Sequence, residues 1–253
     1  MTRAGVKPGK DFWLAALRHE GAAFRAAVSE EAFPAAVPSC PGWTVRDLVG
    51  HLGALYQRVR GHITRGVTTR PEQAEDPVLP EGAELLSWWD QQFEELTGVL
   101  DQIDPELPAW NWAPQAKKAV FWHRRMAHET AIRRWDAQVA SGLTEPIETK
   151  LAVDGVAEVL DTWLPAGKRR SQPQAVGLVQ LHASDIEHSW LVRVRREGIA
   201  LLDTSTVMHE EHAVKARASG TVSDLLLALY GRVPFEVLDL SGDVRLLEAL
   251  RTG

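Results

Sequence analysis

The chain has 253 residues, of which 45% are hydrophobic and 25% are charged, an ordinary composition for a globular protein. Its 34 acidic residues outnumber its 28 basic ones, and the net charge of -6 argues against a nucleic-acid partner, because phosphate binding needs a basic face. No apolar run approaches the roughly 20 residues of a membrane span, and no signal peptide is evident. With the single cysteine Cys40, an internal disulfide is excluded. We expect a cytoplasmic protein without a membrane partner, and its oligomeric state stays open.

The first half of the chain carries four helical patterns. Apolar residues recur at helical spacing in each of them. Pro34 closes the first, Thr44 and Asp47 form a capping box at the start of the second, and Gly142 follows the fourth. Four amphipathic helices joined by loops predict a four-helix bundle. The helices are expected at residues 11–33, from residue 44 onwards with an apolar stripe that reaches residue 59, over a stripe at 85–103, and at 115–140.

The second half changes character near residue 146. One more helix is expected at 153–164, after which the hydrophobic period shifts towards two, which is typical of strands. Strands are expected at 189–195, 198–203, 212–218 and 235–240, and helices at 222–230 and 243–251. The fold class is therefore α+β with two domains. We expect a four-helix bundle over residues 1–145 and a small α+β domain over 146–253.

Two polar residues lie on inward stripes of the predicted bundle. His51 lies on the apolar stripe of the second helix, where a core histidine is the commoner alternative to a ligand or catalytic group. Glu129 lies on a partly apolar stripe of the fourth helix, where a buried carboxylate must be paired, protonated or bound to a cation. The alternative is an ion ladder of Arg125, Glu129 and Arg133, and spacing alone favours this ladder.

The remaining histidines and the cysteine give weaker signals. His123 and His128 lie off the stripe of Glu129, and His209 and His212 lack the i, i+4 spacing of a helical zinc motif, so all four are expected to be structural or solvated. Cys40 is expected to be a small buried apolar residue rather than a nucleophile, because no histidine is near it in sequence. Nucleotide-binding and serine-hydrolase motifs are absent.

Three stretches resemble the mycothiol-dependent maleylpyruvate isomerase family, whose N-terminal domain is a DinB-like bundle. They read CPGWTVRDLVGHLGALY (40–56), FWHRRMAHETAIRRWDA (121–137) and SGTVSDLLLALYGR (219–232). LAVDGVAEVL (151–160) is similar to the start of the family's C-terminal domain. These stretches follow the family's order across nearly the whole chain, so the resemblance implies the family's fold.

The resemblance also implies mycothiol as the thiol cofactor and a divalent metal, usually zinc, inside the bundle. Its ligands in the family are a histidine from the GHL stretch, and a glutamate and a histidine spaced i, i+4. His51 and Glu129 match the first two, whereas Arg133 stands at the third. A guanidinium cannot donate a lone pair, so zinc is doubtful and the metal site is expected to be impaired. We expect His51 and Glu129 to face each other, and Arg133 to hydrogen-bond Glu129.

The family's C-terminal domain implies an arginine that meets a carboxylate in the active cleft. Arg232 in YGR matches it by motif, and a surface arginine after a helix end is the alternative. The expected function is a mycothiol-dependent isomerase or thiol S-transferase that acts on a small electrophilic or carboxylate substrate. Catalytic roles fall to Arg133 and Arg232, and cofactor binding falls to Arg232. A metal-free, non-catalytic small-molecule-binding protein of the same fold is the alternative.

Overall fold

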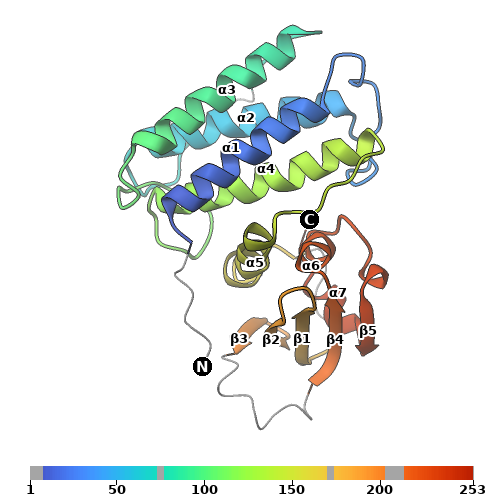
Figure 1. Ribbon diagram of the computed structural model, residues 1–253. Helices are drawn as coiled ribbons and strands as arrows, with labels where there is room; N and C mark the ends of the chain where they lie inside the picture. The colour runs from blue at the N-terminus through green and yellow to red at the C-terminus, as the bar shows by residue number, and fades with distance from the viewer. Residues whose placement is uncertain (1–7, 73–76, 170–173, 203–213, 253) are drawn as a thin grey trace. The chain divides into compact units, whose positions relative to one another are not determined.

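The computed structural model describes residues 8–72, 77–169, 174–202 and 214–252 (Figure 1). The chain divides into two compact units, Met1–Glu145 and Pro146–Gly253. The first unit is a bundle of helices and the second holds a five-stranded sheet with helices. The predicted fold class, a four-helix bundle followed by a small α+β domain, is confirmed. Within the described ranges, no helix is long and apolar enough to cross a membrane.

The bundle consists of α1 (Lys10–Ala27), α2 (Val45–Thr64), α3 (Glu84–Gln102) and α4 (Val120–Ala140). Helix α1 packs mainly against α4, and α2 packs mainly against α3 (Figure 1). An aromatic cluster fills the core, in which the Trp89 ring lies 5.0 Å from Phe24 and 5.9 Å from Tyr56 between centroids. Rings that meet at such distances add to the stability that comes from burial itself.

The start of α2 agrees with the sequence. The Thr44 side chain accepts a hydrogen bond from the backbone N–H of Asp47, and the Asp47 carboxylate accepts one from the backbone N–H of Thr44. This reciprocal pair satisfies two backbone donors that the helix itself leaves without partners. The capping box therefore fixes where α2 begins.

Two predicted helix ends are wrong. Helix α1 ends at Ala27 instead of residue 33, because Val28 is extended and the Ser29 hydroxyl accepts a hydrogen bond from Ala32 N–H. That turn lets Val28 and Phe33 both enter the core. Helix α4 begins at Val120 instead of residue 115, because the Lys117 amine is bound by loop carbonyl groups and holds the preceding segment in a turn.

The second unit is built on a sheet with the strand order β3-β2-β1-β4-β5. Strands β1 and β4 are parallel, and the other neighbours are antiparallel. One face is apolar and buried, and it includes Val179, Leu181, Trp190 and Val192. The strands are β1 (Gly177–Ala183), β2 (His188–Arg195), β3 (Gly198–Leu202), β4 (Val214–Gly220) and β5 (Asp239–Gly242).

The helices of the second unit pack with this sheet. Helices α6 and α7 contact β1 and β4, and α5 packs against α6 (Figure 1). Thr221 caps α6 by accepting a hydrogen bond from Asp224 N–H, as the sequence predicts. The helices are α5 (Thr149–Glu158), which continues as a π-helical turn (Val159–Trp163), α6 (Val222–Leu229), a short 3-10 turn (Phe235–Val237) and α7 (Val244–Glu248).

The central strand β1 escaped prediction, and its alternation is interrupted only at its first residues. Its register with β4 shifts between Leu178 and Val179, and both residues are buried. Leu178 packs with Leu191 on the opposite face from the main core, so two neighbouring apolar residues face opposite sides. The period of two is therefore regular only from Val179 to Ala183, a stretch of five residues.

Other element bounds differ from the predictions. The strand expected at 235–240 is a 3-10 turn followed by β5, and the last helix is shorter than 243–251. The helix expected at 153–164 begins earlier, at Thr149, because the Glu148 side chain caps it, and it changes to a π-helical turn at Val159. Residues 203, 212 and 213 of the predicted strands lie outside the described residues.

Candidate functional site

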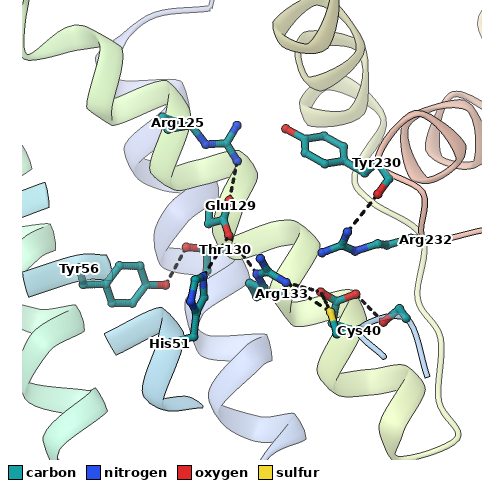
Figure 2. Close-up of polar contacts among 11 residues, drawn as sticks. Cys40, His51, Tyr56, Arg125, Glu129, Thr130, Arg133, Tyr230 and Arg232 are labelled. Carbon is teal, nitrogen blue, oxygen red and sulfur yellow. Dashed lines mark hydrogen bonds and ion pairs between the residues drawn. The ribbon is translucent and has the colours of Figure 1, made fainter. Parts of the chain in front are cut away.

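The candidate site is a ladder of charges on α4, in which Glu129 lies between two arginines (Figure 2). Arg125 Nη2 donates to Glu129 Oε2 at 2.9 Å, and Arg133 Nε donates to Glu129 Oε1 at 2.9 Å. The ladder predicted from the i, i+4 spacing is thus confirmed. Its burial differs from that of an exposed helix face, because the side chain of Arg125 is only 3% exposed and that of Glu129 only 12%.

The electrostatics of the ladder favour charged forms throughout. Burial opposes ionisation of Glu129, but the nearby charges of Arg133 and Arg125 outweigh it and hold the pKa of the carboxyl well below its usual range. Burial likewise opposes the charge of Arg133, and Glu129 and Asp136 outweigh it and raise the pKa of the guanidinium. Glu129 is therefore a carboxylate at any physiological pH.

His51 on α2 faces the same carboxylate. Its Nε2 lies 4.0 Å from Glu129 Oε1, so the two side chains face each other as predicted (Figure 2). The side chain of His51 is 39% exposed, which argues against the alternative of a core histidine. The edge of its ring meets Trp43, with 4.8 Å between the centroids. The imidazole is thus held in place by Trp43 while one side stays accessible.

Arg133 extends the ladder to a second carboxylate. Its Nη1 donates to Asp136 Oδ2 at 3.1 Å and to Cys40 Sγ at 3.4 Å. Asp136 is fully buried and also accepts hydrogen bonds from the Ser39 hydroxyl at 2.6 Å and the Cys40 thiol at 3.4 Å. These bonds fasten the segment before α2 to α4. They also place the Cys40 sulfur beside the Arg133 guanidinium.

The expectation for Cys40 is wrong. The residue is partly exposed and takes part in this polar cluster, instead of being a buried apolar residue. The prediction judged its neighbours by closeness in sequence, whereas Arg133 is 93 positions away along the chain. Only the packing of the segment before α2 against α4 brings these residues together.

Trp43 is among the residues of the site that the sequence analysis did not identify. The Arg133 guanidinium lies over the Trp43 ring, 5.3 Å from its centroid, in a cation–π arrangement. The same ring contacts His51. Trp43 therefore positions both the imidazole and the guanidinium. The signal available in the sequence was its place in the CPGW stretch, next to the capping box of α2.

A buried hydrogen bond closes the apolar side of the site. The Tyr56 hydroxyl and the Thr130 hydroxyl are 2.7 Å apart, with both residues buried (Figure 2). Burial raises the pKa of Tyr56, so the phenol stays neutral. Because Thr130 follows Glu129 on α4, this bond fixes α2 against α4 close to the carboxylate.

The other histidines take structural positions where they are described. His123 is buried, and its ring nitrogens meet the carbonyl oxygens of Ala119 at 3.1 Å and Leu100 at 2.9 Å, which ties α4 to α3. His128 is also buried, so neither residue is solvated. His209 and His212 lie outside the described residues.

Arg232 belongs to the second unit and follows α6. Gly231 has a φ of 68°, which ends the helix in a conformation that suits glycine. Arg232 Nη1 then donates to the carbonyl oxygen of Tyr230 at 3.0 Å. The Tyr230 hydroxyl donates to Glu158 Oε2 at 3.1 Å, which joins α6 to α5. The guanidinium of Arg232 is thus oriented by its own helix end.

The described part of the chain contains no group of three or more His, Cys, Asp or Glu side chains that could hold a metal ion. At the candidate site, His51 and Glu129 stand at the positions of the first two metal ligands that the resemblance implies. Arg133 stands at the third position and is bonded to Glu129.

Comparisons with known proteins agree across both units. A family model described as the mycothiol maleylpyruvate isomerase N-terminal domain matches residues 14–138, and a model of the C-terminal domain of the same enzyme matches residues 150–249. No curated protein sequence matches significantly.

Solved structures with the same fold include the mycothiol-dependent maleylpyruvate isomerase, with a TM-score of 0.63 and 14% identity. A mutant of that enzyme with a histidine replaced by alanine gives a TM-score of 0.62 and 13% identity. Each match covers 94% of this chain and 95% of the other.

Proposed function

Because the chain belongs to the mycothiol-dependent maleylpyruvate isomerase family, we propose that it is a mycothiol-dependent isomerase or thiol S-transferase that acts on a small electrophile. The observation that carries the proposal is the pair of His51 and Glu129, 4.0 Å apart beside Arg133. When bound, mycothiol supplies the nucleophilic sulfur. A reaction that uses a free thiol suits a reducing compartment, and we place the protein in the cytoplasm.

We propose that the family's metal site is impaired in this chain. Zinc in catalytic sites takes three protein ligands and keeps one position open. His51 and Glu129 supply two, and Arg133 has no lone pair to donate. Both carboxylate oxygens of Glu129 already accept a guanidinium hydrogen bond. This set of donor atoms does not fit a zinc ion.

The roles proposed for this chain's own residues follow from their contacts. Arg133, with its guanidinium fixed by Glu129 and Asp136, holds an anionic group of the thiol or the substrate by charge-assisted hydrogen bonds. Arg232 is proposed to bind a substrate carboxylate, for which a guanidinium is suited by its paired donors. His51 and Trp43 line the accessible side of the bundle site and orient what binds there.

The two units contribute different residues to the proposed function. We propose that they are the two domains of the chain, divided between Glu145 and Pro146. The bundle carries the Glu129 ladder with His51, and the second domain carries Arg232. The partners are therefore a small-molecule thiol and a small electrophilic or carboxylate substrate.

The test is turnover with purified protein. Candidate electrophiles, including maleylpyruvate, are incubated with and without mycothiol, and isomerised products and thiol conjugates are measured by chromatography and mass spectrometry. We expect mycothiol-dependent product with the wild type and a strong loss in Arg232→Ala. Arg245→Gln removes an exposed arginine of the same domain and serves as the control. Mycothiol binding without any turnover would favour a non-catalytic binding protein instead.

A further inference from the structure

The oxygen of Glu129 that faces His51 is the one that Arg133 already holds. Glu129 Oε1 lies 4.0 Å from His51 Nε2 and 2.9 Å from Arg133 Nε. The other oxygen, Oε2, accepts from Arg125 at 2.9 Å. An ion bridging His51 and Glu129 would therefore lie next to the positive charge of Arg133. In a partly buried site such repulsion is screened far less than in water.

The Arg133 guanidinium is fixed from several directions. Nε donates to Glu129, Nη1 donates to Asp136 and Cys40, and the plane lies over the Trp43 ring. Its side chain is only 14% exposed. Moving it aside for an ion would break these bonds, including the one to the fully buried Asp136, and removing one member of a buried ion pair is costly.

The same guanidinium keeps donors for a ligand. None of the hydrogen bonds above uses Nη2, which carries two N–H groups. Nη1 already lies 3.4 Å from a sulfur atom, that of Cys40, so sulfur is a suitable neighbour for this group. A guanidinium presents several donors in a fixed plane, which suits a bound anion.

We propose that Arg133 is a built-in cation that replaces the metal ion, so that this chain binds its thiol ligand and works without zinc. The inference rests on the proposed function for the identity of the ligand. It deepens that function by naming the group that supplies the positive charge. Zinc binding tests the inference separately from turnover.

The experiment is a zinc titration of the purified full chain by calorimetry and by competition with a chromophoric chelator. We expect weak binding by the wild type. Arg133→His adds a third ligand and should raise zinc affinity by more than the roughly ten- to hundredfold that an outer-shell partner contributes. Arg124→His places a new imidazole on the same helix, outside the ladder, and should leave the affinity unchanged. The double variant Arg133→His/His51→Ala should lose the gain.

Folding of every variant is checked by circular dichroism, and mycothiol binding to the wild type is measured with EDTA present. Unchanged mycothiol binding in EDTA is the expected result. Stoichiometric, tight zinc in the wild type, or loss of mycothiol binding in EDTA, would overturn the inference. If the wild type binds little zinc but turns over no substrate, the inference stands and the proposed activity fails.

Discussion

Glu129 pairs with two guanidinium groups inside the bundle, and a variant can show how much stability depends on it. Glu129→Gln keeps the shape but removes the carboxylate charge that pairs with the buried Arg125. Removing one member of a buried pair costs about 3–5 kcal/mol. We expect the free energy of unfolding in urea to fall by about that amount at pH 7.

The control for this variant is an exposed pair. Arg18 lies 3.3 Å from Asp101, and both side chains are about half exposed. Arg18→Gln should cost less than about 1 kcal/mol, because water screens such pairs. Similar losses in the two variants would show that burial of the Glu129 ladder contributes nothing extra.

His62 makes the stability of the bundle depend on pH. Its ring lies 4.9 Å from that of Trp110 and 5.4 Å from that of Trp122, and burial, with the charges of Arg58 and Arg65, lowers its pKa to about 4. The folded state therefore favours the neutral ring. Its contribution to stability is complete above the unfolded pKa of about 6.5 and is lost as the pH falls through the folded pKa.

We expect the melting temperature of the wild type to fall between pH 6.5 and pH 4, the window set by this pKa. In His62→Gln, which does not titrate, this part of the decrease should be absent. The measurement is a series of thermal melts across that pH range. Parallel curves for the two proteins would rule out His62 as the source.

Much of the candidate site could be predicted from the sequence, but not all of it. The i, i+4 spacing on one helix predicted the contacts of Glu129 with Arg125 and Arg133, because such contacts depend only on helix geometry. The prediction that His51 lies near Glu129 rested on the inward-facing stripes of two helices. The contacts of Arg133 with Cys40 and Trp43 depend on how a loop packs on α4, and no local pattern encodes that.

At the scale of elements, one glycine in a helix interior shows where two helices approach closely. A Cβ atom on Gly21 of α1 would lie 2.2 Å from the Phe93 ring, which is stacked on Trp89 and cannot move freely. Overpacking costs about 1–3 kcal/mol, against a gain in helix propensity of about 1 kcal/mol. We expect Gly21→Ala to lower the free energy of unfolding in urea by up to about 2 kcal/mol.

The control is Gly61 of α2, around which a Cβ atom would meet nothing within 4 Å. Gly61→Ala should raise the free energy of unfolding by up to about 1 kcal/mol, because alanine favours the helix. If both variants were stabilised, the close approach of α1 and α3 at Gly21 would be contradicted.

Elements with a local start signal were predicted best. The capping boxes at Thr44 and Thr221 gave the beginnings of α2 and α6. The end of α1 and the strand β1 were missed for tertiary reasons. Val28 leaves the helix to bury Phe33 beyond it, and β1 has apolar residues on both faces at its bulge. In both elements, tertiary packing overrides the structure that the local sequence pattern favours.

At the scale of the whole molecule, the proposed domain boundary can be tested by truncation. Arg134 Nη1 donates to the carbonyl oxygen of Glu145 at 2.7 Å, and Gln138 Nε2 donates to its carboxylate at 2.9 Å. These bonds fasten the end of the bundle to α4. We expect the fragment 1–145 to unfold cooperatively as an isolated helical domain.

The fragment 1–142 lacks Glu145 and leaves Arg134 with fewer partners. Hydrogen bonds to charged groups contribute about 1.5–3 kcal/mol each, so this fragment should be less stable by about that amount in urea. The measurement is helical circular dichroism against urea concentration for both fragments. A non-cooperative transition for 1–145 would contradict the proposed boundary.

The charge ladder on α4 also bears on how this site can change by mutation. A single nucleotide change converts some arginine codons into histidine codons, so position 133 can pass between a cation and a metal ligand in one mutational step. In this chain Arg125 pairs with one oxygen of Glu129 and Arg133 pairs with the other. If Arg133→His binds zinc as expected, this single step would exchange a metal-free site for a metal-bearing one while Arg125 still pairs with Glu129.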